Sequence, residues 1–354
     1  MGAKGSCMIF EKASVRKILV IKLRAIGDVL LSTVVLPGLR QEFPDSTIDF
    51  LCEIPAAGVI QGNPYIDHAL IFDAKSENGL SLITRIRKQK YDLVIDLFGN
   101  PRSAVVTLFS NARYRVGYRF SWRRYCYSIV VNPRGGEVHN AEFNLDAVRF
   151  LGVPVSGQSP YFPLTEEARL FAEEFVKANN LENSFLIAVN AGGGWYTKKW
   201  RPDHYASLLR RCCDEFDVRA VLVWGPGELD VVRAISEKIG HRGIITPPTT
   251  IPQLGAVLKR CTMMVTNDSG PMHIAAALGV PVVAVFGPTN PLLQGPLGSH
   301  SEVVRKEDLD CLACNLTACP IGNPCMEALS VDQVYRTVKK FIEQLHASSI
   351  EHHG

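Results

Sequence analysis

The sequence of 354 residues contains no hydrophobic run of the roughly 20 residues that a membrane-spanning helix requires. Its start, MGAKGSCMIFEKASVRK, lacks the long apolar core and small-residue cleavage site of a secretory signal. The net charge is only +3, which provides no strong general attraction to nucleic acid. These absences predict a soluble, cytoplasmic protein that has no nucleic-acid partner.

Two series of short apolar segments alternate with predicted helices along the chain. These helices include residues 28–42 and a helix over residues 168–177 that Thr165 caps. The first series contains KILVIK, TIDFLC, ALIF and DLVIDL, and the second contains FLIAVN, RAVLVWG, GIIT, MMVTN and VPVVAVFG. Unbroken apolar strands that alternate with helices predict a parallel sheet covered on both faces. The Pro/Gly/Ser-rich stretch LGVPVSGQSPYFPLTEEA separates the two series.

We therefore predict an α/β protein with two doubly wound halves, residues 1–160 and residues 161–330. For the final helical segment, residues 331–354, packing back on the first half is one option. The carboxyl ends of the strands in two such halves usually surround a cleft in which ligands bind.

The stretch RAIGDVLL places a carboxylate where one apolar segment turns into the next. Gly27 permits a tight turn and close approach of a ligand. Asp28 then falls in the first turn of a helix, where spacing alone favours a helix cap. The alternative is a general base that takes a proton from an incoming hydroxyl. The two roles conflict in part, because a carboxylate that accepts backbone hydrogen bonds is a weaker base.

The stretch VTNDSGPMHIAAALGVPVVAVFGPTNP predicts a strand, a tight turn, a helix start and a second strand that ends in a Gly-Pro-Thr turn. Free backbone N–H groups at such a helix start form an anion site. Serine and histidine side chains there add polar groups, which favours a phosphate or pyrophosphate ligand over an ordinary capped helix. The candidate residues are Asp268, Ser269, Gly270, His273 and Thr289.

Two further turns follow predicted strands. In NAGGGWYTKKWRP, a flexible glycine loop precedes Lys198, and this combination suits a phosphate-bearing ligand. The alternative for Lys198 is a solvated loop. The loop is not a dinucleotide fingerprint, because Thr197 occupies the position of the third glycine. In WGPGELD, Glu228 is a candidate to bind a ribose, or else a partner of the helix dipole.

Arginines and aromatic residues alternate in NARYRVGYRFSWRRYCYS. Such a pattern suits RNA, because aromatic rings stack on bases, and it also suits a membrane surface or an anionic glycolipid. Arginine binds carboxylates and phosphates through two hydrogen bonds, whereas any single arginine is equally compatible with solvated surface. The candidates for binding such an anionic ligand, which would be the acceptor of a transferred group, are Arg24, Arg119, Arg123 and Arg124.

Ten cysteines are present, and several of them fall in apolar stretches that predict burial. The six scattered ones are Cys7, Cys52, Cys126, Cys212, Cys213 and Cys261. The other four, Cys311, Cys314, Cys319 and Cys325, form a C-x2-C-x4-C-x5-C cluster. Four thiols in one segment suit zinc or an iron–sulfur cluster, but the spacing is not that of a zinc ribbon. Structural thiols and a structural metal both remain open.

Taken together, these motifs resemble the family 9 glycosyltransferases, the ADP-heptose:lipopolysaccharide heptosyltransferases. The matching stretches are the RxGDVLLSTVVLP start, TKKW, WGPGE and NDSGPMHIAAALGVPVVAVFGPTNP, in the family's order along nearly the whole chain. The resemblance implies a GT-B fold, with two Rossmann-like domains facing a central cleft. It implies inverting transfer of a heptose from ADP-heptose to the lipopolysaccharide inner core, with no required metal or cofactor.

The resemblance also implies roles for individual residues. Asp28 becomes the base, Gly27 beside it binds the donor, and Lys198 neutralises the donor phosphates. Glu228 contacts the ribose, and Thr249 lies on the adenine side. The turn from Asp268 to His273 binds the donor. The first half then binds an anionic acceptor at the cytoplasmic face of the inner membrane, as a peripheral protein.

Two other functions remain as alternatives. One is a nucleotide-sugar 2-epimerase on the same scaffold, and the other is a sensor that binds a nucleotide sugar or glycolipid without catalysis. The basic first half argues against an epimerase, because an epimerase has no sugar acceptor. The sequence does not indicate which core heptose is added or how many copies assemble.

Overall fold

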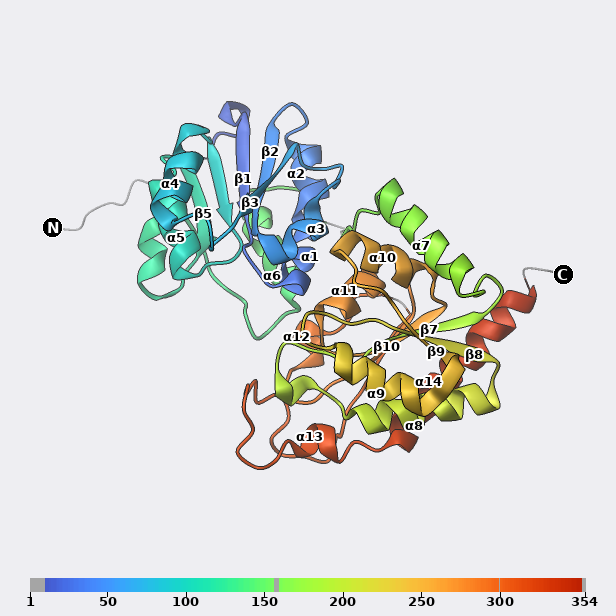
Figure 1. Cartoon of the computed structure of the whole chain (residues 1–354). Coiled ribbons are helices and arrows are strands. Elements are labelled where there is room, and N and C mark those ends of the chain that lie inside the picture. Colours follow the sequence, from blue (N-terminus) through green and yellow to red (C-terminus); the bar gives the residue numbers. More distant parts are fainter. Residues whose placement is uncertain (1–9, 156–158, 299, 352–354) are drawn as a thin grey trace. The chain divides into compact units, whose positions relative to one another are not determined.

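The computed structural model describes residues 10–155, 159–298 and 300–351 (Figure 1). Cys7 lies outside them. The chain divides into two compact units, Met1–Pro163 and Leu164–Gly354. Each unit contains one six-stranded sheet, and every strand pair in both sheets is parallel.

The first sheet has the strand order β3-β2-β1-β4-β5-β6. Its strands are β1 (Lys17–Ile21), β2 (Thr47–Glu53), β3 (His68–Phe72), β4 (Leu93–Asp96), β5 (Tyr114–Tyr118) and β6 (Ile129–Val131). The helices are α1 (Ile26–Ser32), α2 (Leu36–Glu42), α3 (Ala57–Ile60), α4 (Gly79–Lys88), α5 (Pro101–Phe109) and α6 (Asn140–Arg149). The short 3-10 helices are η1 (Lys12–Ser14), η2 (Thr33–Val35), η3 (Ile54–Ala56) and η4 (Ser121–Cys126).

The second sheet has the strand order β12-β11-β10-β7-β8-β9. Its strands are β7 (Phe185–Asn190), β8 (Val218–Leu222), β9 (Gly243–Ile245), β10 (Met263–Asn267), β11 (Val282–Val285) and β12 (Ser301–Val304). The helices are α7 (Glu166–Ala178), α8 (Pro202–Glu215), α9 (Leu229–Ile239), α10 (Ile251–Arg260), α11 (Gly270–Ala277), α12 (Pro291–Gln294), α13 (Pro324–Glu327) and α14 (Val331–Glu351). The 3-10 helices are η5 (Tyr196–Lys198) and η6 (Gly240–Arg242).

The two sheets share one topology. Numbered from its own first strand, each sheet has the order 3-2-1-4-5-6, which is the doubly wound Rossmann order. The α/β fold with two doubly wound parallel sheets, predicted from the alternating pattern, is confirmed. In this topology ligands bind beyond the carboxyl ends of the first and fourth strands, where the chain reverses direction across the sheet. Those strands are β1 and β4 in the first unit, and β7 and β10 in the second.

Burial on both faces explains why the strands lack polar alternation. Four consecutive residues of β1, from Ile18 to Ile21, are fully buried. Helices of the second unit lie on both sides of its sheet, with α10 packed against α7 and α11, and α8 packed against α9 and α14 (Figure 1). Thr165 caps α7 as predicted, because its hydroxyl accepts a hydrogen bond from the Ala168 N–H at 3.3 Å.

The segment 28–42, predicted as one helix, is interrupted by η2. Pro37 lies at the start of α2 and has no N–H to donate to the Thr33 carbonyl, so a continuous helix would lose that bond. The interruption leaves α1 as a short helix that follows β1 directly.

The final helix, α14, belongs to the core of the second unit. Val334, Val338 and Ile342 recur at helical spacing and are fully buried in a cluster that includes Leu208 and Cys212. The helix packs against α8, β11 and β12. That residues 331–354 also pack back on the first half stays a prediction. Within the described residues, every helix is too short or too polar to span a lipid bilayer.

Candidate functional site

The start of α11 lies beyond the carboxyl end of β10. Ser269 is the N-cap residue, yet its side chain makes no capping hydrogen bond in the described structure. The Ser269 hydroxyl instead accepts a hydrogen bond from Asn190 Nδ2 at 2.9 Å and lies 3.2 Å from Thr266 Oγ1. Ser269 therefore does not occupy this helix start with its side chain, and the positive end of the helix dipole there suits an anion.

Three predicted donor residues from three different loops meet beside this helix start. Lys198 Nζ lies 2.7 Å from Asp268 Oδ2, and the Thr289 hydroxyl donates a hydrogen bond to the same oxygen at 2.7 Å. The side chains of Lys198 and Asp268 are only 14% and 6% exposed. Lys198 Nζ also lies 4.5 Å from the centroid of the Trp195 ring. Asp268 thus holds a partly desolvated ammonium group at the rim of the anion site.

Glu228 connects two neighbouring loops. Its Oε1 accepts a hydrogen bond from the Gly193 N–H and its Oε2 accepts one from the Gly225 N–H, both at 2.9 Å. It is also the N-cap residue of α9. The carboxylate therefore holds the glycine loop against the WGPGE turn, whether or not it also contacts a ribose.

Close packing explains why the loop beside Glu228 contains glycine. A Cβ added to Gly192 would overlap with the Glu228 carboxylate, whereas a Cβ added to Gly194 would meet nothing within 4 Å. Gly192→Ala should therefore displace Glu228 and lower the free energy of unfolding by about 1–3 kcal/mol. Gly194→Ala is the matched control and should leave stability unchanged. Denaturant unfolding of both variants measures the difference, and equal stability would contradict this account of the loop.

The remaining donor candidates of the second unit lie at the same edge of its sheet. Gly270 is the first residue of α11, and His273 lies in its first turn with an exposed fraction of 8%. Thr249 is half-buried in the loop between β9 and α10. Except for Gly27, which lies in α1 of the first unit, the predicted donor residues are thus distributed over the loops that follow β7, β8, β9, β10 and β11.

In the first unit, Asp28 is the third residue of α1 and is half-buried. Its Oδ2 accepts a hydrogen bond from the Ala25 N–H at 3.2 Å, so the predicted capping contact is present. Gly27 beside it is buried, and Arg24 is exposed in the preceding loop. A carboxylate held in this way keeps lone pairs for a proton, so the capping contact does not exclude a role as base.

Lys22 lies just after β1, and the sequence patterns did not identify it as a candidate site residue. Its Nζ donates a hydrogen bond to the Leu97 carbonyl at 3.0 Å and lies 3.5 Å from Asn144 Oδ1. Burial lowers the pKa of Lys22, and the nearby carboxylates of Asp28 and Asp96 oppose that shift. The signal in the sequence that could have identified it is a lysine directly after an apolar strand.

The arginines of the first unit fall into two groups. Arg115 donates to the carbonyls of Ala112 and Cys126, and Arg113 pairs with Glu11, so both have structural partners. Three of the four predicted acceptor arginines form the second group, in or beside η4, whereas Arg24 precedes α1. Arg119 and Arg124 are exposed and Arg123 is half-buried.

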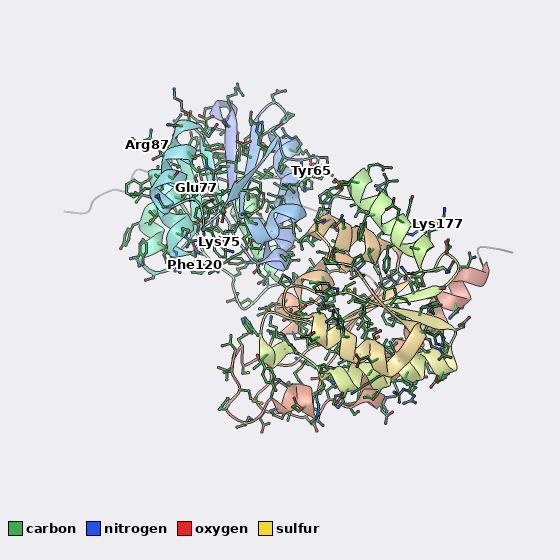
Figure 2. All side chains as sticks on the ribbon, viewed as in Figure 1. Tyr65, Lys75, Glu77, Arg87, Phe120 and Lys177 are labelled. Atoms are coloured by element: carbon green, nitrogen blue, oxygen red, sulfur yellow. The ribbon has the colours of Figure 1, made fainter. Side chains whose placement is uncertain are left out.

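Aromatic rings support two of these acceptor arginines. Arg123 stacks over Phe120, which Figure 2 labels, and Arg124 stacks over Tyr125. Trp122 and Tyr125 are 50% and 71% exposed. The segment around η4 therefore presents positive charge and aromatic surface together.

The model of glycosyltransferase family 9 (heptosyltransferase) matches residues 80–324, which is more than half of the chain. The chain belongs to glycosyltransferase family 9. It is therefore a glycosyltransferase, which confirms the resemblance noted in the sequence and disfavours the epimerase and the sensor.

Individual relatives agree with this family assignment. Lipopolysaccharide heptosyltransferase 3 of E. coli K12 is 27% identical over 319 residues, which cover 80% of this chain and 89% of the relative. A family 9 glycosyltransferase structure from Veillonella parvula has a TM-score of 0.82 at 27% identity, covering 93% of this chain and 97% of that one. The structure of E. coli ADP-heptose lipopolysaccharide heptosyltransferase II has a TM-score of 0.77 at 22% identity, covering 93% and 99%. These neighbours share the GT-B-type fold.

The cysteines of this family 9 chain differ in their surroundings. The five scattered ones among the described residues are all buried, as predicted. In the cluster, Cys311 and Cys314 are exposed, whereas Cys325 is buried. Burial, with a contribution from the other three thiols, raises the pKa of Cys325 to about 11. Across the described ranges, no three side chains of His, Cys, Asp or Glu are grouped so that they could hold a metal ion.

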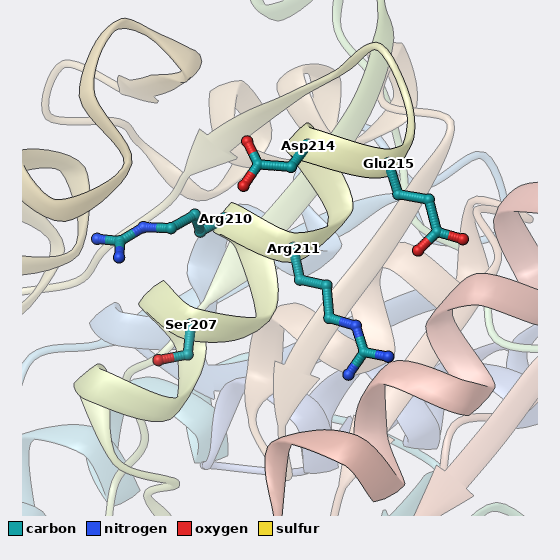
Figure 3. A pocket seen from close by; sticks show the side chains of 5 residues that line it. All are labelled: Ser207, Arg210, Arg211, Asp214 and Glu215. Carbon is teal, nitrogen blue, oxygen red and sulfur yellow. The ribbon is translucent and has the colours of Figure 1, made fainter.

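A hollow of about 510 Å³ lies along α8, away from the loops described above (Figure 3). Arg210 and Arg211 point to opposite sides of the helix. Arg211 pairs with Asp332 at 2.6 Å, and Arg210 donates to the Lys238 carbonyl at 2.8 Å. Because both guanidinium groups already have partners, the hollow has no convergent set of polar groups for a ligand.

Proposed function

We propose that this glycosyltransferase transfers a heptose from ADP-heptose to the inner core of lipopolysaccharide. One observation carries the proposal. In a family 9 chain, Lys198, Asp268 and Thr289 meet at the start of α11, where an ammonium group and the positive end of the helix dipole suit a diphosphate. The names of the relatives from E. coli support the heptose, the ADP carrier and the lipopolysaccharide acceptor.

The second unit would hold the donor. The α11 start and Lys198 would bind the two phosphates, with His273 and Ser269 beside them. Glu228 would contact the ribose from the loop after β8, and Thr249 would lie on the adenine side. As the bond between the sugar C1 and the phosphate oxygen breaks, that oxygen keeps the electron pair. Positioned cations and N–H groups that stabilise such a leaving group contribute several kcal/mol to catalysis.

The first unit would supply the base. The acceptor hydroxyl attacks C1 from the face opposite to the departing ADP, so the configuration at C1 inverts. Its proton passes to a carboxylate oxygen of Asp28 while the new C–O bond forms. The negative charge of Asp28 would also stabilise the positive charge that develops on the sugar ring. None of these steps requires a metal or a cofactor.

The exposed arginines around η4, with Arg24, would bind the acceptor. Phosphates and carboxylates of an inner core match the fork geometry of Arg119, Arg123 and Arg124. Exposed Trp122 and Tyr125 are of the type found at membrane–water interfaces. We therefore place the enzyme at the cytoplasmic face of the inner membrane as a peripheral protein. Sedimentation with vesicles that contain anionic lipid tests this, and salt-independent lack of binding would refute it.

The release of ADP tests the function directly. We expect ADP-heptose to yield ADP only when a lipopolysaccharide core acceptor is present, and other nucleotide sugars to react more slowly. Arg123→Gln should raise the KM for the acceptor without changing the affinity for ADP. Binding of the donor without turnover would favour a sensor, and turnover without an acceptor would favour an epimerase or hydrolase.

A further inference from the structure

We propose that Asn267 is a positioning residue of the donor site, because its side-chain amide holds both ends of the loop that carries Lys198. Asn267 is the last residue of β10, at the point where the strand order reverses, and it is fully buried. No part of the chain's local pattern distinguishes it from an ordinary strand end. The inference deepens the proposed function, since the loop concerned is the one that would bind the donor phosphates.

The Asn267 amide makes four hydrogen bonds, two to residues 191 and 192 and two to residues 200 and 205. Nδ2 donates to the carbonyls of Ala191 and Gly192, each at 2.9 Å. Oδ1 accepts from the Trp200 N–H at 3.1 Å and from the Tyr205 hydroxyl at 2.9 Å. An amide side chain has two N–H donors and two acceptor lone pairs, so its whole capacity is used.

These partners also determine which way the amide points. A flipped amide would place its NH₂ group against the Trp200 N–H and its oxygen against two carbonyl oxygens. Both encounters are repulsive, so the observed orientation is the one that the surrounding groups allow. The amide therefore acts as a two-sided clip rather than as a filler of the core.

The clip encloses residues 193–199. One end of this segment is held at Gly192 and the other at Trp200, and Lys198 lies between them. Inside the segment, the Thr197 hydroxyl donates to the Leu316 carbonyl at 2.7 Å, and Lys198 pairs with Asp268. Because Asn267 directly precedes Asp268, one strand end sets the place of both the ammonium group and its carboxylate partner.

The test compares three variants of the full-length protein. Asn267→Ala removes all four hydrogen bonds, and Asn267→Asp replaces the NH₂ group by an oxygen that faces the Ala191 and Gly192 carbonyls. Tyr205→Phe is the matched control, because it removes one bond to Oδ1 without touching the loop. We expect ADP to bind about tenfold more weakly to both Asn267 variants. We expect Tyr205→Phe to bind ADP as the wild type does, and the KM for the acceptor to stay unchanged throughout.

A second measurement does not depend on ADP or on activity. Amide hydrogen exchange of the ligand-free protein should become faster across 192–200 in Asn267→Ala, with α8 beyond Tyr205 unchanged. A general loss of structure would instead accelerate exchange throughout the second unit. If Asn267→Asp does not fold, Asn267→Ala decides the matter.

Each remaining outcome has one meaning. Unchanged exchange across 192–200 in folded Asn267→Ala overturns the proposal, and so does loss of the fold in both Asn267 variants. Faster loop exchange combined with a wild-type protein that binds no ADP would support the clip and refute the proposed function instead.

Discussion

Asp28→Asn is expected to slow sugar transfer by about 10²–10⁴-fold while the affinity for ADP stays unchanged. The variant is informative because the asparagine Oδ1 can still accept the hydrogen bond that the Ala25 N–H donates to Asp28. It keeps the helix cap and removes only the group that takes the proton. Initial rates with ADP-heptose and a core acceptor, together with calorimetric binding of ADP, measure the two quantities.

Asp28→Ala is the control that separates the two roles of this carboxylate. It removes both the base and the cap, so it should be as inactive as Asp28→Asn and also less stable by about 1 kcal/mol. Denaturant unfolding measures that difference. An active Asp28→Asn enzyme would show that Asp28 is a helix cap only, and the base would have to be sought elsewhere.

Lys198→Met is the second substitution with a large expected effect. It removes the ammonium group at the anion site, so turnover should fall by about 10²–10³-fold, and binding of ADP should weaken. It also leaves the 6% exposed Asp268 side chain without its ion-pair partner, which should lower the melting temperature. Lys199→Met is the matched control, since the neighbouring lysine forms no ion pair within the described part of the chain.

A double variant separates the effect on stability from the effect on catalysis. Lys198→Met with Asp268→Asn removes the unpaired charge, so the melting temperature should recover toward that of the wild type. Turnover should not recover, because the phosphates still lack the ammonium group. Recovery of turnover in the double variant would show that Lys198 serves only to neutralise Asp268.

Local patterns predicted nine of the twelve strands in the described residues and missed β5, β6 and β12. The apolar run from Ile18 to Ile21 predicted β1, and Thr165 predicted the start of α7. Burial on both faces and helix capping can each be recognised from a pattern of a few residues. The pattern failed at η2, where Pro37 interrupts a helix whose apolar spacing continues. It also left the place of α14 open, since an apolar stripe shows that a helix packs but not on what.

The candidate site divides in the same way. The turns after the strands were predicted as ligand-binding loops, because parallel strands bring their carboxyl ends to one edge. What each side chain does there was not predictable. Glu228 accepts hydrogen bonds from two glycine N–H groups, and Arg115 donates to backbone carbonyls, whereas Arg119 and Arg124 are exposed. The spacing of the arginines in the sequence does not distinguish those with structural partners from those that are exposed.

The sequence by itself determined the two doubly wound sheets, the order along the chain of the loops that follow the strands, and the family. Each of these depends on patterns that are only a few residues long. Only the tertiary structure decided that Lys198 and Thr289 both contact Oδ2 of Asp268. It also decided that Asn267 holds the loop at Gly192 and at Trp200. These partners are separated by about 20 to 75 residues of chain. Their contact depends on the register of neighbouring strands and the path of each loop, which no local pattern contains.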